Sequence, residues 1–293
     1  MNPNLERIVD LLTELSTSRL DSTAIAWVLD RQKVIRSGDR KALYLAFGLT
    51  PRKVGKADLE PTSDELWTVA SARPGWNARG WSVDQAVRTL FLLSFPSQDP
   101  VSYVMTLNQL FGTGEVGELV AMYQALPLLP HPSAHVLRAA EGIRTNIKAV
   151  FCAVAHQNPY PAEQFSEDQW NQMVLKCQFI DVPVSPIMGL DRRANERLSL
   201  MVMDFIHERR AAKRTVAPDL WRCVSRFANT AALAELRIVL TTGSTIEQQA
   251  AALALADCPD PEAKQILSFA PELAGRVAKG TIAWSTIDAT DGG

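Results

Sequence analysis

Apolar residues recur at intervals of three and four along most of the chain, which is the spacing of one face of an α-helix. The first twenty residues show this spacing at Leu5, Ile8, Val9, Leu12 and Leu15, with acidic residues between them. Strict alternation of apolar and polar residues, the pattern of a half-buried strand, does not persist anywhere along the chain. The sequence therefore predicts an all-α protein.

Several of the predicted helices carry start signals. Three segments have the form of a capping box, in which a hydroxyl and a side chain three residues later satisfy backbone groups at a helix N-terminus. They are Thr62 with Glu65, Ser82 with Gln85, and Ser166 with Gln169. Asp99 also precedes Pro100, and a proline fits the first position of a helix. A helix is therefore expected to begin at each of these places.

From Ser244 onward the predicted helices are short and paired. We expect helices over 246–256, 262–269 and 271–279, with a proline-containing turn after the first. This pattern favours an irregular α-solenoid of HEAT-like helical pairs, with an irregular orthogonal bundle as the alternative. An N-terminal helical region, 1–130, and a central and C-terminal repeat region, 131–293, are expected to form one continuous array.

Composition narrows the class of protein. The chain has 293 residues, more than one compact core usually holds, and its 47% hydrophobic content excludes a disordered protein. A formal net charge of −2 gives no electrostatic reason to expect binding to nucleic acid or to an anionic membrane. No apolar run is long enough to cross a bilayer, and the N-terminus lacks the pattern of a signal peptide. We expect a cytoplasmic protein without a membrane span.

Motifs for metals and cofactors are incomplete. The 4 cysteines stand far apart, so we predict buried free thiols, with a disulfide or metal site as the alternative. His207 and Glu208 resemble the start of the zinc-binding H-E-x-x-H helix, but Ala211 stands where the second histidine belongs. Three glycines between 112 and 117 follow a predicted helix instead of a strand, so they indicate a turn and not a dinucleotide site. We predict no metal and no cofactor.

Polar and aromatic residues crowd the segment 144–222, where a purely structural helix would use leucine and alanine. A helix predicted from about Pro132 ends at His156, because prolines follow it closely, so His156 is expected to cap the helix or to bind a ligand. Asn171 is expected to hydrogen-bond the backbone of the nearby proline-rich turn or a ligand. The remaining two histidines, His131 and His135, are predicted to lie on the surface.

The same segment carries motifs that resemble the EboA family of metabolite traffic proteins, which bacterial ebo gene clusters encode. The matching motifs are NPYPAE at 158–163, WNQMVLK at 170–176, GLD at 189–191, HER at 207–209 and LWR at 220–222. The resemblance implies a role in ebo-dependent biosynthesis or export of a secondary metabolite. It also implies other ebo proteins as partners, among them a membrane prenyltransferase-like protein. It identifies no catalytic residue.

Two classes of function remain open. The first is a non-catalytic adaptor or carrier that binds a partner protein or metabolite in a helical groove lined by Tyr160, Trp170 and Trp221. The second is an enzyme of unknown reaction acting on that metabolite through acid or base residues. We favour the first. The enzyme would use His156, Glu163, Lys176 and His207 in its pocket. The candidate binding residues are Asn146, His156, Asn158, Tyr160, Glu163, Trp170, Asn171, Lys176, Asp191, Asp204, His207 and Arg209.

Overall fold

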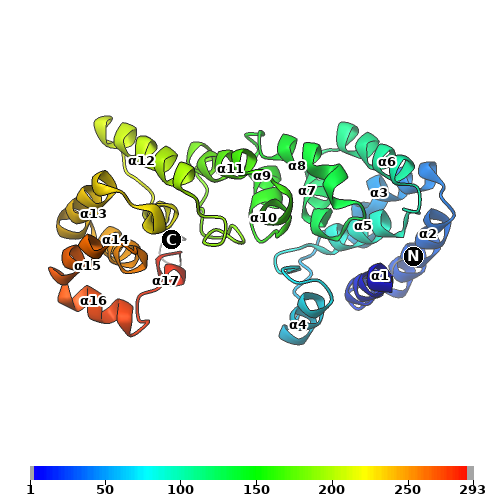
Figure 1. The fold of residues 1–293 in the computed structure, drawn as a ribbon. Helices are drawn as coiled ribbons and strands as arrows, with labels where there is room; N and C mark the ends of the chain where they lie inside the picture. Colours follow the sequence, from blue (N-terminus) through cyan, green and yellow to red (C-terminus); the bar gives the residue numbers. More distant parts are fainter. Residues whose placement is uncertain (1–2, 289–293) are drawn as a thin grey trace. The chain divides into compact units, whose positions relative to one another are not determined.

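The computed structural model describes residues 3–288, and these residues are mostly helical (Figure 1). Within this range no strand forms, and the extended segments meet only in an isolated antiparallel bridge between Asp58 and Ser82. The predicted all-α class is confirmed. The chain divides into two compact units, Met1–Ser166 and Glu167–Gly293. The boundary expected after residue 130 lies inside the first unit.

The first unit consists of α-helices joined by short connections and two 3-10 turns. Its elements are α1 (Pro3–Thr17), α2 (Ser22–Arg36), α3 (Arg40–Val54), α4 (Ser63–Ala72), α5 (Val83–Ser94), α6 (Pro100–Thr113), α7 (Val116–Ala125), η1 (Leu126–Leu128), η2 (Pro132–His135), α8 (Val136–Gly142), α9 (Lys148–Ala155) and α10 (Tyr160–Gln164).

Helix α5 forms the centre of the first unit. Apart from Gln85, all of its residues are buried, and it packs against α1, α2, α3 and α7. The polar residues on it are paired, as buried charges must be. Arg88 donates from Nη1 to Asp84 at 2.7 Å and from Nε to the carbonyl of Phe47 at 3.1 Å. The expected start signal is present, since the Ser82 backbone N–H donates to the Gln85 side chain at 2.9 Å.

The helix expected from Pro132 to about residue 156 is broken into η2, α8 and α9, so that prediction was wrong. Helix α8 ends at Gly142, a closely packed position where an added Cβ would lie 2.7 Å from Val154 and 2.8 Å from Tyr123. The chain leaves the helix there and re-enters it at Lys148. The expected end of the helix is confirmed, because the backbone N–H of His156 caps α9 on the Cys152 carbonyl at 2.9 Å.

The second unit also surrounds one buried helix. Its elements are α11 (Glu167–Ile180), α12 (Glu196–Ala211), η3 (Pro218–Cys223), η4 (Ser225–Phe227), α13 (Thr230–Thr242), α14 (Thr245–Asp257), α15 (Pro261–Ser268), α16 (Pro271–Ala278) and α17 (Trp284–Asp288).

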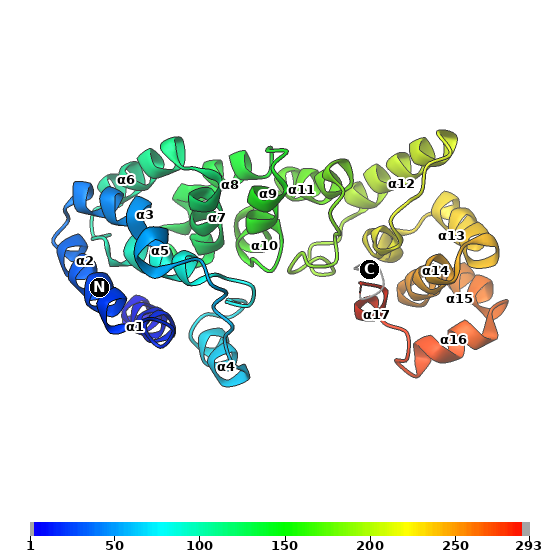
Figure 2. The same cartoon turned by 180° about the vertical axis from the view of Figure 1, so that it is seen from behind.

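Helix α14 is the buried helix, and its residues 250–255 are all buried. It packs against α13, α15, α16, α17 and η3, as Figures 1 and 2 show. Small alanine side chains allow this close approach from several directions. The three short helices expected beyond Ser244 form as α14, α15 and α16. The HEAT-like solenoid stays a prediction.

The cysteines are free thiols, and Cys177, Cys223 and Cys258 are buried, as the sequence predicted, whereas Cys152 is half-buried. Burial raises the pKa of the Cys223 thiol well above its ordinary value, which keeps that side chain uncharged. Of the three clustered glycines, Gly114 lies in the turn between α6 and α7, as expected, whereas Gly112 belongs to α6 and Gly117 to α7. Among residues 3–288, no helix combines the length and the apolar character that a bilayer crossing requires.

Candidate functional site

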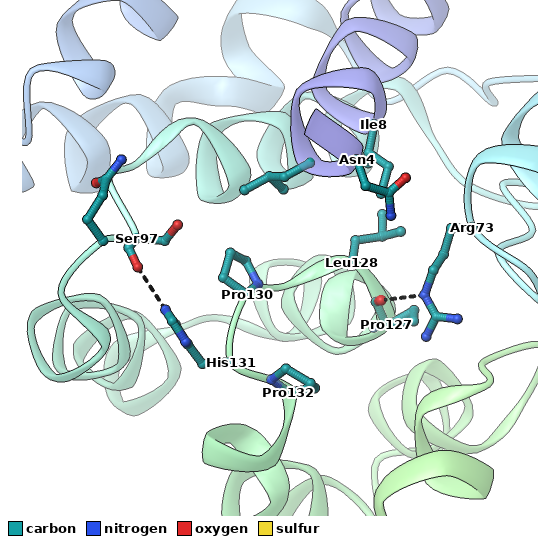
Figure 3. A pocket seen from close by; sticks show the side chains of 11 residues that line it. Asn4, Ile8, Arg73, Ser97, Pro127, Leu128, Pro130, His131 and Pro132 are labelled. Atoms are coloured by element: carbon teal, nitrogen blue, oxygen red, sulfur yellow. Dashed lines mark hydrogen bonds between the residues drawn. The ribbon is translucent and has the colours of Figure 1, made fainter. Parts of the chain in front are cut away.

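The first unit contains a cavity of about 620 Å³ (Figure 3). Its walls come from the start of α1, the residue after α4, the α5–α6 connection and the segment from η1 to η2. Pockets of roughly 300–1,000 Å³ are typical of small-molecule sites. The lining residues are Asn4, Leu5, Ile8, Arg73, Ser97, Gln98, Pro127, Leu128, Pro130, His131 and Pro132. Since these residues are distant in sequence, the cavity exists only in the folded unit.

One wall of the cavity is a proline-rich turn that holds His131. Pro130 and Pro132 flank this histidine, and each proline ring fixes its own backbone angle. His131 has a φ of 58°, in the left-handed region that non-glycine residues rarely adopt. Such a conformation costs about 1–3 kcal/mol and persists where the surrounding structure enforces it, often at functional sites.

The His131 ring is fixed from two sides. Its Nε2 lies 2.8 Å from the backbone carbonyl oxygen of Ser97. Because a carbonyl only accepts hydrogen bonds, Nε2 must carry the proton, and Nδ1 is then the acceptor nitrogen of the neutral ring. The edge of the ring also packs against buried Tyr103, with centroids 6.1 Å apart. The cavity wall therefore presents a histidine of defined tautomer and orientation.

Arg73 lies across the cavity from His131 (Figure 3). Its Nε donates to the carbonyl of Pro127 at 3.0 Å, and its Nη1 donates to the carbonyl of Pro74 at 2.9 Å. Nη1 and Nη2 also donate to the two carboxylate oxygens of Glu163, at 3.1 and 2.6 Å. The guanidinium is thus held in place by the proline-rich wall and by the NPYPAE motif.

The NPYPAE residues support this cavity and do not line it. The Tyr160 hydroxyl donates to the carbonyl of Pro132 at 2.5 Å. Asn158 donates from Nδ2 to the carbonyls of Tyr123 and Ala153, at 3.0 and 2.9 Å, and its Oδ1 accepts from the Tyr160 N–H at 3.0 Å. Asn158 therefore braces the turn at 159–161, the role expected of Asn171.

The other two candidates of the first unit are Asn146 and His156. Asn146 is exposed, and His156 is half-buried at the end of α9. Neither belongs to the residues that line the cavity.

Asn171 makes a different contact, in the second unit. Its side-chain amide pairs with that of Asn195 through two hydrogen bonds, at 3.1 and 2.9 Å. The Asn195 Oδ1 also caps α12 by accepting from the Leu198 N–H at 2.8 Å. The expected bond from Asn171 to the backbone of the turn at 159–161 was wrong, because the side chain of Asn195 satisfies this buried amide.

Two further candidates have structural partners in the second unit. Trp170 is fully buried, with the Arg193 guanidinium 5.0 Å from its ring centroid. Asp191 accepts two hydrogen bonds from Arg222, at 2.7 and 2.6 Å, which hold the pKa of its carboxyl below the ordinary value. The GLD and LWR motifs therefore meet in one ion pair.

Helices α11 and α12 carry the exposed candidates. Asp204 and His207 are exposed on α12, and His207 Nε2 lies 4.0 Å from the carboxylate of Glu235. The Arg209 guanidinium lies 5.9 Å from the centroid of the Phe205 ring. Lys176 is half-buried on α11. In the described part of the chain, no group of three or more histidine, cysteine, aspartate or glutamate side chains is placed to hold a metal ion.

Two expectations about the aromatic and histidine residues were wrong. Tyr160, Trp170 and Trp221 are at most 2% exposed, so they belong to the cores of their units and not to an open groove. His135, expected on the surface, is 1% exposed and bonds the Pro130 carbonyl through Nε2 at 2.9 Å. His131 is half-buried in the cavity wall. The run of prolines from 127 to 132 was the sequence signal for this wall.

A comparison with protein families identifies the family of this chain. A family model described as "Metabolite traffic protein EboA" matches residues 8–225. The chain belongs to the EboA family. The EboA span, residues 8–225, contains every lining residue of the cavity except Asn4 and Leu5. No curated protein and no solved structure matches the chain.

Proposed function

We propose that this EboA-family protein is a non-catalytic carrier that binds a small metabolite in the first-unit cavity. The observation that carries the proposal is the cavity itself, about 620 Å³ in volume, with a rigid proline-rich wall and polar groups on opposite sides. A preformed pocket with few, well-placed polar groups is the usual form of a small-molecule site. The family description, a metabolite traffic protein, supports carriage of a metabolite.

The carrier is favoured over an enzyme by the way the polar groups are engaged. Glu163, which the sequence suggested as an acid or base, is held on both carboxylate oxygens by Arg73. Arg73 is itself bonded to the carbonyls of Pro127 and Pro74. Among the described lining residues, His131 is the one histidine, and its Nε2 is bonded to the Ser97 carbonyl. The cavity therefore offers groups for binding and no acid–base pair.

We infer that the carrier also acts as an adaptor for other proteins of the ebo cluster, including the membrane prenyltransferase-like one. In this role it serves biosynthesis or export of a secondary metabolite from the cytoplasm. Lys176, Asp204, His207 and Arg209 of the second unit, with Asn146 of the first, are the proposed partner contacts. Asp204, His207 and Asn146 are exposed, so their replacement can weaken partner binding without unfolding either unit.

The carrier role is tested by filling the cavity. Gln98 is exposed and lines it, so Gln98→Trp adds a large side chain without burying a polar group. The matched control is Gln265→Trp, at an exposed glutamine of α15 in the second unit. Wild type and Gln265→Trp purified from the native host should retain a small molecule, detected by mass spectrometry, that Gln98→Trp lacks. Equal small-molecule content in all three proteins would refute the carrier role.

The adaptor role is tested separately with Lys176→Met and His207→Gln. Methionine keeps most of the lysine volume and removes its charge, and glutamine keeps a polar side chain. We expect both variants to stay folded but to capture less of the ebo partner proteins and to export less metabolite. If both support full export in a complementation assay, the second-unit surface is not the partner site.

A further inference from the structure

The charges around the cavity cancel. Among the described lining residues, Arg73 is the only one with a permanent charge, and Glu163 neutralises it through a two-point ion pair. The first turn of α1, which also faces the cavity, carries Glu6, and an acidic residue there offsets the positive end of the helix dipole. Carboxylates therefore already neutralise both positive groups that an anionic ligand could contact, the Arg73 guanidinium and the N-terminus of α1.

Two hydrogen-bonding positions remain open on opposite sides of the cavity. Arg73 has five N–H groups, and four of them donate to Pro127, Pro74 and Glu163. The fifth, on Nη2, has no partner among the described residues. Across the cavity, Nδ1 of His131 is the open acceptor, since Nε2 donates to the Ser97 carbonyl. One side thus offers a donor and the other an acceptor.

We propose that the cavity selects uncharged ligands that carry a hydrogen-bond acceptor at one end and a hydroxyl or amide donor at the other. The acceptor meets the open N–H of Arg73, and the donor meets Nδ1 of His131. A carboxylate at the Arg73 end has to compete with Glu163, and a ligand without a donor leaves Nδ1 unpaired in the cavity wall. This inference rests on the proposed carrier function and defines its substrate class.

Three matched probes separate charge from donor capacity. 4-(Hydroxymethyl)acetophenone is uncharged with a ketone acceptor and a hydroxyl donor, its methyl ether lacks the donor, and 4-(hydroxymethyl)benzoate replaces the ketone by a carboxylate. Binding to the full chain is followed by the backbone amide NMR shifts of Gln98 and Leu128, which line the cavity. We expect the alcohol-ketone to bind about tenfold more tightly than either other probe, the effect of one lost or mismatched hydrogen bond.

Glu163→Gln tests the cause of the charge selection. Glutamine retains one oxygen for Arg73 but removes the compensating charge, so the benzoate should gain about tenfold in affinity relative to the alcohol-ketone. Glu141→Gln is the control, because Glu141 pairs with Arg138 and neither residue lines the cavity. Its probe preferences should equal those of wild type.

The outcomes distinguish the inference from the carrier function. If wild type binds the benzoate as tightly as the alcohol-ketone, with shifts at Gln98 and Leu128, the selection for uncharged ligands is wrong and the carrier cavity stands. If the ether binds as tightly as the alcohol, the role of His131 as acceptor is wrong. If no probe shifts these two residues, the cavity is not a binding site, and both proposals fail. The wild-type measurements hold even if Glu163→Gln does not fold.

Discussion

Asn158 provides a sharp test of how the first motif of the EboA span supports the cavity. Its side chain is 4% exposed and makes three hydrogen bonds, two as a donor to the carbonyls of Tyr123 and Ala153 and one as an acceptor from the Tyr160 N–H. Tyr160 in turn bonds the Pro132 carbonyl in the cavity wall. Replacing Asn158 with alanine should therefore loosen the connection between α7, α9 and this wall.

The expected loss follows from the three bonds. Each intramolecular hydrogen bond contributes about 0.5–1.5 kcal/mol, so Asn158→Ala should cost the first unit about 3 kcal/mol. For a folding unit of this size, about 2–4 °C of melting temperature is lost per kcal/mol, which predicts a drop of about 6–12 °C. Asn158→Asp should cost still more, because it keeps the acceptor for Tyr160 but turns a carboxylate oxygen toward two carbonyl oxygens.

Thermal unfolding gives the order of the variants, and hydrogen exchange at α9 and α10 localises the effect. Asn77→Ala is the control, since the Asn77 side chain makes two hydrogen bonds in exposed positions, to the Gln157 side chain and from the Arg79 N–H, and their loss should cost about 1 kcal/mol. If Asn158→Asp is as stable as wild type, or more stable than Asn158→Ala, the two donor bonds do not hold this segment and the reasoning fails.

Asn171→Ala should cost the second unit about 1–3 kcal/mol, because it removes both hydrogen bonds between the Asn171 and Asn195 amides and leaves Asn195 bonded only to the Leu198 N–H and the Arg193 carbonyl. Faster hydrogen exchange in the first turn of α12 is the readout. Burial lowers the pKa of His135 below its ordinary 6.5. The contribution of the neutral ring to stability is therefore present above pH 6.5 and is lost as the pH falls below 6.5. Between these conditions, the melting temperature of His135→Gln should fall less than that of wild type. The hydrogen bond from Arg19 lowers the pKa of Glu65 from 4.5 to about 2. The contribution of the Glu65 carboxylate to stability is therefore present above pH 4.5 and is lost as the pH falls toward 2. In an acid titration, Glu65→Gln should lack this part of the stability loss.

The fold class could be read from the sequence because helical spacing and caps are local signals. The capping box at Thr62 and Glu65 forms as expected, with the Thr62 N–H donating to Glu65 at 2.7 Å and the Glu65 N–H donating to Thr62 at 3.3 Å. The close packing at Gly142 could not be read from the sequence, since Tyr123 and Val154 approach it from other elements. Local patterns locate helices, whereas contacts between elements are known only from the folded structure.

The candidate site shows the same limit at the level of side chains. The sequence named Glu163 and Tyr160 as candidate binding residues, but it could not identify the distant partners, Arg73 and Pro132, that connect them to the cavity. The sequence predicts His131 on the surface because Pro132, at an expected helix start, separates it from His135. Its left-handed backbone and its bond to Ser97 emerge only when the α5–α6 connection lies beside the proline-rich turn.

The second unit shows that the EboA span depends on residues beyond its own end. The span stops at Ser225, yet the Ser225 hydroxyl donates to Asp257 at the end of α14, at 3.0 Å, and Arg226 reaches the same carboxylate at 3.2 Å. Leu220 and Trp221 of the LWR motif are buried in η3, which packs against α14. Burying one such side chain contributes about 1.5–3 kcal/mol, and this gain exists only when α14 is present. The helices beyond residue 225 therefore help to hold the LWR motif in place. They also help to hold the GLD motif, because Arg222 of LWR bonds Asp191 of GLD.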